Sequence, residues 1–176
     1  MNGAWFDYTA KAALQQGDLL WQCPFIQVAQ ESLETETRFK AENVHAVVMT
    51  QSCDLVLRKD GKPKSETVLL ARYLTRSELS AHPKFSQASA WEEARSKGRL
   101  ARFHVLNKAK LGVGVEDFAL VDLGATFNLE FHLVLSAAKE NQTRPRLLPP
   151  YREHLSQAFA RDYMRVGLPS DIPPFV

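Results

Sequence analysis

The chain has few cysteines, no long apolar run and no large excess of either charge. Its two cysteines, Cys23 and Cys53, are too few for a fold built on disulfides, and the first residues lack the basic and apolar stretches of a signal peptide. No apolar run approaches the roughly 20 residues that cross a membrane. These absences predict a cytoplasmic protein with reduced thiols and no membrane partner.

The sequence also lacks the common motifs of nucleotide and metal binding. It contains no phosphate-binding loop, no Gly-x-Gly-x-x-Gly fingerprint and no Gly-x-Ser-x-Gly elbow, and Gly112-Val113-Gly114 lacks the third glycine. No two of the Cys and His positions have the close spacing of a zinc site. We therefore expect no cofactor and no metal.

The charge balance does not indicate a strongly basic nucleic-acid binder. The 22 Lys and Arg residues nearly cancel the 20 Asp and Glu residues, which leaves a net charge of +2 at pH 7. A chain of 176 residues with 45% hydrophobic residues can bury a sizeable core. One domain spanning residues 1–176 is the expectation, and the overall charge says little about a partner.

The apolar residues recur in short runs that predict about six strands, most of them joined by short turns. The expected strands cover residues 19–29 with a bend at Pro24, 44–49, 67–74, 100–106, 118–123 and 126–135. The last two would be joined tightly at Gly124-Ala125. The polar stretch 31–43 would form a loop or the tip of a long hairpin.

Three segments have the composition of helices. Residues 8–16 are rich in Ala, Leu and Gln, residues 75–98 predict a helix or two helical turns broken near Pro83, and residues 151–166 carry a helical period. Helices that do not alternate with strands predict an α+β fold, built as a curved antiparallel sheet or a small SH3-like β-barrel with N-terminal, middle and C-terminal helices. The tail, residues 170–176, is expected to pack over the surface.

The polar segment 50–54, Thr-Gln-Ser-Cys-Asp, directly follows an apolar strand, where functional groups are often presented. Cys53 is a candidate nucleophile, with Asp54 beside it and His45 as the candidate base, because a thiolate needs a nearby base or cation. His104 and His132 are the alternative bases. In the other interpretation, the Thr, Ser and Asp side chains close a turn and Cys53 is a packed structural thiol.

The predicted C-terminal helix carries basic residues on one side. At about 100° per residue, one side of this helix is expected to face the core, with Leu155, Phe159, Tyr163 and Val166. The candidate contacts to nucleic acid or another partner lie on a different side and just upstream: Arg144, Arg146, Arg152, His154, Gln157, Arg161 and Arg165. Arginine suits phosphates and carboxylates alike. The alternatives are a solvated helix face, partly neutralised by Glu153 and Asp162, and a docking surface for an acidic protein.

Two short motifs, Gly17-Asp18-Leu19-Leu20-Trp21 and Ala46-Val47-Val48-Met49-Thr50-Gln51, resemble the start of the PemK/MazF toxin family. The resemblance covers about the first 55 residues. It implies a small curved β-barrel that cleaves or binds RNA, pairs with an antitoxin and forms a homodimer. The family's Arg-Pro before the second strand is replaced here by Val44-His45, so its catalytic arginine has no counterpart, and His45 or Arg72 would have to substitute for it.

The leading hypothesis from the sequence is a small cytoplasmic, barrel-like domain that binds RNA, DNA or a phosphorylated partner in a bacterial toxin–antitoxin or defence system. One alternative is a ribonuclease or a thiol-dependent enzyme centred on Cys53. The other is a non-catalytic subunit of a protein complex. The surroundings of Cys53 and of the basic helix distinguish these hypotheses.

Overall fold

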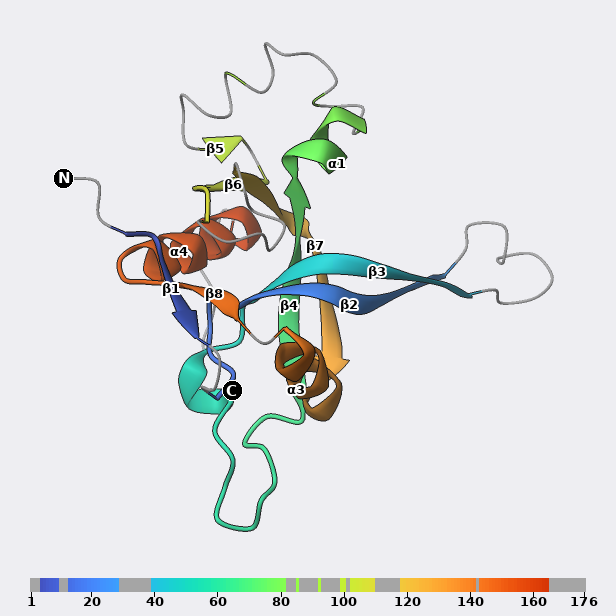
Figure 1. The fold of residues 1–176 in the computed structure, drawn as a ribbon, viewed down its shortest axis with the longest axis vertical. Coiled ribbons are helices and arrows are strands. Elements are labelled where there is room, and N and C mark those ends of the chain that lie inside the picture. The colour runs from blue at the N-terminus through green and yellow to red at the C-terminus, as the bar shows by residue number, and fades with distance from the viewer. Residues whose placement is uncertain are drawn as a thin grey trace, which may run out of the picture.

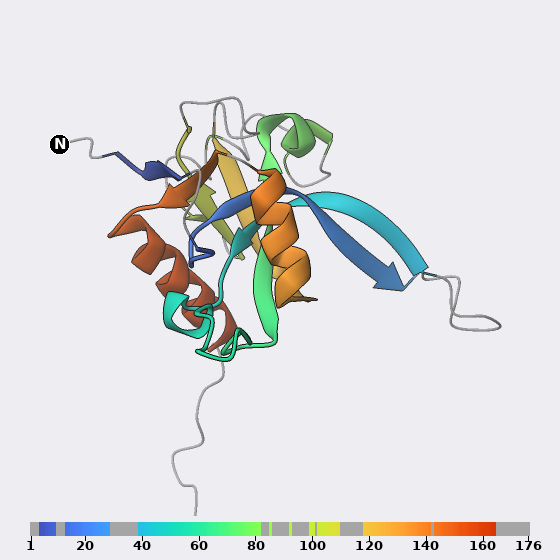
Figure 2. The same ribbon diagram turned by 60° about the horizontal axis from the view of Figure 1, so that its bottom comes forward.

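The computed structural model describes residues 4–9, 13–28, 39–81, 85, 92, 99–100, 102–109, 118–141 and 143–164. These residues form an α+β fold in which a curved antiparallel sheet lies between two helices, as Figures 1 and 2 show. Within the described ranges the strands do not close into a barrel. The curved-sheet form of the predicted fold therefore agrees with the structure.

The main sheet has six strands, and every pairing in it is antiparallel. In spatial order the strands are β2 (Leu19–Val28), β3 (Phe39–Val48), β4 (Thr67–Thr75), β7 (Ala119–Glu130), β6 (Phe103–Leu106) and β5 (Arg99–Leu100). Strands β3, β4 and β7 occupy the middle because their β-branched and leucine side chains are buried on both faces. The apolar runs predicted as strands thus form the centre of the sheet.

A second, two-stranded sheet pairs β1 (Phe6–Thr9) with β8 (Arg144–Leu147). Gly17 joins it to the main sheet, because the amide of Leu147 donates to the Gly17 carbonyl (2.9 Å) while the Gly17 amide donates to the carbonyl of Val48 (2.8 Å). Gly17 has φ +84°, and a Cβ atom there would lie 3.0 Å from the Cβ of Leu147. Only glycine fits this junction without strain.

The two long helices cover opposite faces of the sheet. Successive side chains of β3 point to opposite faces of the sheet and so belong to two different hydrophobic cores. Val47 belongs to the core that includes Leu155 of α4 (Tyr151–Tyr163), and Val48 belongs to the core that includes Phe131 of α3 (Phe131–Glu140). A short helix, α1 (Arg76–Ala81), follows β4, and a 3₁₀ turn, η2 (Ser52–Asp54), follows β3. The sheet is consequently the central layer of a three-layer arrangement (Figure 2).

The predicted N-terminal helix is wrong. Phe6–Thr9 is strand β1, residues 13–16 are not helical, and residues 10–12 lie outside the described residues. Pairing with β8 and the stacking of Trp5 on Tyr151, at 3.9 Å between ring centroids, outweigh the helix propensity of this segment. The middle helix is described only as α1, because Pro83 and Gly98 lie outside the described residues, as does the tail.

The predicted turn at Gly124-Ala125 is also wrong, since β7 runs through it as one strand. The glycine accommodates a guanidinium instead of a turn: a Cβ at Gly124 would lie 2.6 Å from Nε of Arg102. That guanidinium donates to both carboxylate oxygens of Asp122 (2.6 and 2.8 Å). Residues 131–135, predicted as the end of a strand, begin α3, whose first amides donate to the side chain of Glu130.

Three strand boundaries differ from the prediction. Strand β3 begins at Phe39, so part of the expected loop is a strand. The irregularity in β2 falls between Leu20 and Cys23, where Gln22 has φ +63°, and not at Pro24. Residues 100–106 divide into β5 and β6 around Arg102, which has φ +77°. The predictions for β4 and for a helix from Tyr151 are confirmed.

Candidate functional site

The polar side chains of residues 50–54 fix the turn after β3. The Thr50 hydroxyl accepts a hydrogen bond from the amide of Leu69 (2.7 Å), and the Ser52 hydroxyl accepts one from the amide of Gln16 (3.1 Å). Asp54 forms an exposed ion pair with Lys64 at 2.6 Å, which holds the pKa of its carboxyl below the usual value. These contacts match the interpretation of the segment as a turn.

Cys53 is exposed, so the interpretation of it as a buried thiol is wrong. Its Sγ lies 3.7 Å from Oε1 of Gln51. The structure does not bring His45 to it: the His45 ring instead stacks on Tyr73, with 5.3 Å between centroids. Among the described residues no histidine contacts the thiol, so the geometry provides no base to activate it.

The two thiols should react very differently with iodoacetamide. Cys23 is fully buried, and burial raises the pKa of its thiol to about 12, whereas Cys53 is exposed. We expect one thiol to be alkylated at neutral pH in the folded protein and both in urea, measured by intact-protein mass spectrometry. Cys53→Ser should abolish the folded-state labelling. Rapid labelling of both thiols without denaturant would contradict the burial of Cys23.

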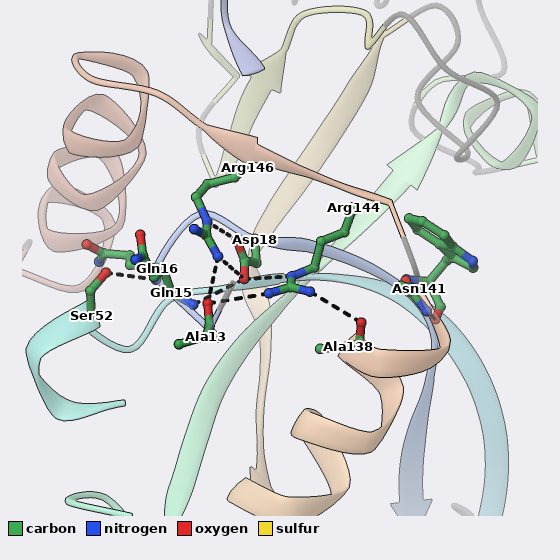
Figure 3. Close-up of polar contacts among 10 residues, drawn as sticks. Ala13, Gln15, Gln16, Asp18, Ser52, Ala138, Asn141, Arg144 and Arg146 are labelled. Carbon is green, nitrogen blue, oxygen red and sulfur yellow. Dashed lines mark hydrogen bonds and ion pairs between the residues drawn. The ribbon is translucent and has the colours of Figure 1, made fainter. Parts of the chain in front are cut away.

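Arg144 and Arg146 lie in an internal ion network and not on the basic side of α4. Figure 3 shows both guanidinium groups on the carboxylate of Asp18, which is completely buried. Nε of Arg144 lies 2.8 Å from Oδ2 of Asp18, and Nε of Arg146 lies 2.5 Å from Oδ1. The Arg144 and Arg146 side chains are only 4% and 11% exposed.

Other donors of this network find acceptors on the backbone. Both arginines donate to the carbonyl of Ala13, and Nη1 of Arg144 donates to the carbonyl of Ala138 (3.3 Å) in the last turn of α3. One carboxylate between two guanidiniums leaves an excess positive charge, and the partial negative charge at the helix C-terminus offsets it. A network this well satisfied holds the chain together and is a poor site for a ligand.

Arg152 and Arg165 do not extend the basic stripe in the described structure. Arg152 donates from Nε and Nη2 to Oε1 of its neighbour Glu153, at 3.1 and 2.7 Å. This pairing occupies Oε1 of the Glu153 carboxylate and lowers the pKa of that group, whereas Oε2 is buried without a hydrogen-bond partner in the described structure. Arg165 lies outside the described residues.

Three of the predicted contacts remain together on the surface of α4. His154, Gln157 and Arg161 are exposed and lie three and four residues apart, so their side chains share one side of the helix. Nε of Arg161 donates to the carbonyl of Gln157 at 3.3 Å. Within the described part of the chain, no ion pair neutralises Arg161.

His104 of β6 lies beside this stripe and was assigned only as an alternative base from the sequence. Burial, together with the charges of His154 and Arg161, lowers the pKa of its imidazole to about 4. Its Nε2 atom is buried and has no hydrogen-bond partner in the described structure. We call His104, His154, Gln157 and Arg161 the α4 face. The effect of His154 and Arg161 on the pKa of His104 has the sign expected of a positive electrostatic potential at this face.

A second group of polar atoms surrounds His45. Nδ1 of His45, Nε of Arg72 and the hydroxyl of Tyr73 are all buried, without a hydrogen-bond partner in the described residues. Nη1 of Arg72 contacts Glu42 at 3.4 Å, and Nη2 contacts Glu78 at 3.9 Å. Tyr73 of β4 lies beside His45 of β3, and Arg72 precedes Tyr73 in the chain. This group lies in the second half of β4, whereas the turn that carries Cys53 begins beside Leu69, near the start of that strand.

A metal site receives no support from the described residues. No three His, Cys, Asp or Glu side chains gather there in a way that could hold a metal ion. No described helix is long and apolar enough to cross a membrane. A cavity of about 370 Å³ between the turn after β3 and α3 is lined by apolar and uncharged side chains, including Leu14, Leu55, Phe131 and Leu135.

Comparison with known proteins adds no functional information. No protein-family model matches the chain, and no curated protein matches it. The α4 face and the groups around it are consequently the features from which a function can be inferred.

Proposed function

We propose that the protein binds RNA or DNA through the α4 face. The observation that carries this proposal is Arg161, which no ion pair neutralises among the described residues, on an exposed helix side that also presents His154 and Gln157. The nearby carboxylate of Glu153 pairs through Oε1 with Arg152 and not with Arg161. Phosphate oxygens accept hydrogen bonds from arginine, histidine and glutamine side chains.

The curvature of the sheet supports a finer version of this proposal. Strands β1, β2, β4, β7 and β6 contribute to one core beneath α4, through residues that include Phe6, Leu19, Tyr73, Val121 and Leu106. We propose that the fold is an open relative of the small SH3-like barrels, which agrees with the PemK/MazF resemblance of the first 55 or so residues. Such a protein would act in the cytoplasm, in a toxin–antitoxin or defence system.

The proposal is tested by fluorescence anisotropy with labelled single-stranded and duplex RNA and DNA across a salt series. Affinity should fall linearly with salt on a logarithmic plot, because phosphate binding releases counterions. Arg161→Ala should weaken binding several-fold on every sequence and reduce the salt slope by roughly 1. The matched control is Arg58→Ala, which removes an exposed arginine from the loop after η2.

Absence of binding at low salt, or equal losses from Arg161→Ala and Arg58→Ala, would overturn the proposal. Binding of a phosphopeptide but of no nucleic acid would assign the α4 face to a phosphorylated protein. Cleavage of the RNA during the titration would favour the ribonuclease alternative, which the buried, unpartnered atoms of His45 and Arg72 support.

A further inference from the structure

The cavity beside α3 has the size of a small-molecule site. Its volume is about 370 Å³, and its lining comes from residues 13–15, from η2 and the residues after it, and from the first part of α3. Figure 1 shows the loop after η2, drawn in teal and green, at the same end of the sheet as α3. Small-molecule sites have volumes of roughly 300–1,000 Å³. A helix of another protein, about 10 Å across, would need more room.

The wall of this cavity is mostly apolar. Leu14, Leu55 and Phe131 are each 2% exposed and belong to the core on the α3 side of the sheet. Val56 and Leu57 also line the cavity, but they are 56% and 49% exposed, which places them at its mouth. None of the described lining side chains is charged. An apolar chain that entered the cavity would shield these mouth residues from water, which is favourable.

The wall also offers a hydrogen-bond donor. Ser52 lines the cavity, and its hydroxyl oxygen accepts a hydrogen bond from the amide of Gln16 (3.1 Å). The hydroxyl hydrogen has no acceptor among the described residues, so it is available to an oxygen atom of a ligand. A mostly apolar wall with a few polar groups is the usual composition of a ligand site.

The loop after η2 brings positive charge to the mouth. Residues 54–65 contain four basic side chains and two acidic ones: Arg58, Lys59, Lys62 and Lys64 against Asp54 and Asp60. Nη2 of Arg58 donates to the carbonyl of Lys64 (3.4 Å), and the amide of Lys64 donates to the carbonyl of Val56 (3.0 Å). Arg58 therefore lies close to a residue of the mouth.

The acidic groups in this region do not neutralise Arg58. Asp54 pairs with Lys64 at 2.6 Å, and no carboxylate pairs with Arg58 among the described residues. On the α3 side, Oε2 of Glu130 accepts hydrogen bonds from the first amides of the helix. The unpaired charge at the mouth is consequently positive, and it favours a ligand whose polar end is an anion.

We propose that this cavity binds a small monocarboxylate with an apolar chain, of the chemical class of a medium-chain fatty acid. The chain fills the space between Leu14, Leu55 and Phe131, and the carboxylate lies at the mouth. There it pairs with Arg58, because a guanidinium fork matches the two oxygens of a carboxylate. An amine with the same chain would place a second positive charge beside Arg58 and is therefore disfavoured.

Isothermal titration calorimetry of the full chain tests this with two probes of equal chain length, decanoate and decylammonium, each below its micelle concentration. Decanoate should bind at a single site, and decylammonium should bind at least tenfold more weakly. Leu135→Trp, which fills the cavity, should raise the dissociation constant of decanoate at least tenfold. Arg58→Gln should raise it several-fold without weakening the binding of decylammonium.

The matched control is Leu133→Trp, which adds the same ring to α3 at a side chain that is 53% exposed and does not line the cavity. It should bind decanoate as the wild type does. Circular dichroism establishes folding of each variant. Where Leu135→Trp fails to fold, Leu57→Ser at the exposed mouth replaces it and should weaken decanoate several-fold.

Three results would each overturn the proposal: no binding of decanoate to the wild type, equal affinity for the two probes, or full affinity in the cavity variant. Equal affinity would show that the cavity accepts any apolar chain and that Arg58 selects no carboxylate. The α4 face lies over the opposite core of the sheet, so decanoate binding and nucleic-acid binding can succeed or fail separately.

Discussion

Asp18→Asn should destabilise the protein by about 3–5 kcal/mol, because it leaves two buried guanidinium groups without their carboxylate. Asp18 is fully buried and contacts Nε of both Arg144 and Arg146. Asparagine keeps the shape and one acceptor but removes the negative charge. The measurement is the midpoint of urea unfolding followed by circular dichroism, at constant pH and salt.

The matched control is Asp54→Asn, which breaks an ion pair with Lys64 that is open to solvent. Its midpoint should stay close to that of the wild type, because exposed ion pairs contribute little. The triple variant Asp18→Asn, Arg144→Met, Arg146→Met should be more stable than Asp18→Asn alone, since it removes the uncompensated charges. Equal midpoints for Asp18→Asn and the wild type would show that the network does not stabilise the fold.

The sequence predicts the parts of the fold that depend on local pattern. The apolar runs that begin near Val44 and Thr67 identify two central strands, and the helical period after Pro150 identifies α4. In each case the local propensity agrees with the packing of the buried face. The start of α3 was missed because residues 131–135 are apolar enough to suit either a strand or a helix, and only the capping by Glu130 decides between them.

The role of the arginines depends on contacts that are distant in sequence. Arg144 lies 126 positions from Asp18, so no spacing rule connects the two residues. The pattern that correctly placed His154, Gln157 and Arg161 on one side of a helix gives no sign that Arg144 and Arg146 point into the interior. Likewise, Gly124-Ala125 is a sequence typical of a turn, but Gly124 lies within β7, where the absence of a side chain leaves room for the guanidinium of Arg102.

His104 should make the fold sensitive to mild acid. Burial, His154 and Arg161 lower the pKa of its imidazole from 6.5 to about 4 in the folded protein. Above pH 6.5 the imidazole is neutral in both the folded and the unfolded states, so it has no effect on stability. Between pH 6.5 and about 4 the unfolded state takes up a proton that the folded state does not, and each pH unit therefore removes about 1.4 kcal/mol.

The expected loss between pH 6.5 and pH 5 is about 2 kcal/mol from His104 alone. His104→Leu should lack this contribution, so the gap between the two pH profiles of urea stability should widen as the pH falls through this window. Burial also lowers the pKa of His45, but His45 and the carboxylates are present in both proteins, so their contributions cancel in the comparison.

Arg161→Ala should reduce the loss slightly, because one of the charges that disfavours the imidazolium is removed. Parallel profiles for the wild type and His104→Leu would show that His104 is protonated as readily in the folded protein as in the unfolded chain, and the α4 face would then lack the positive potential inferred for it.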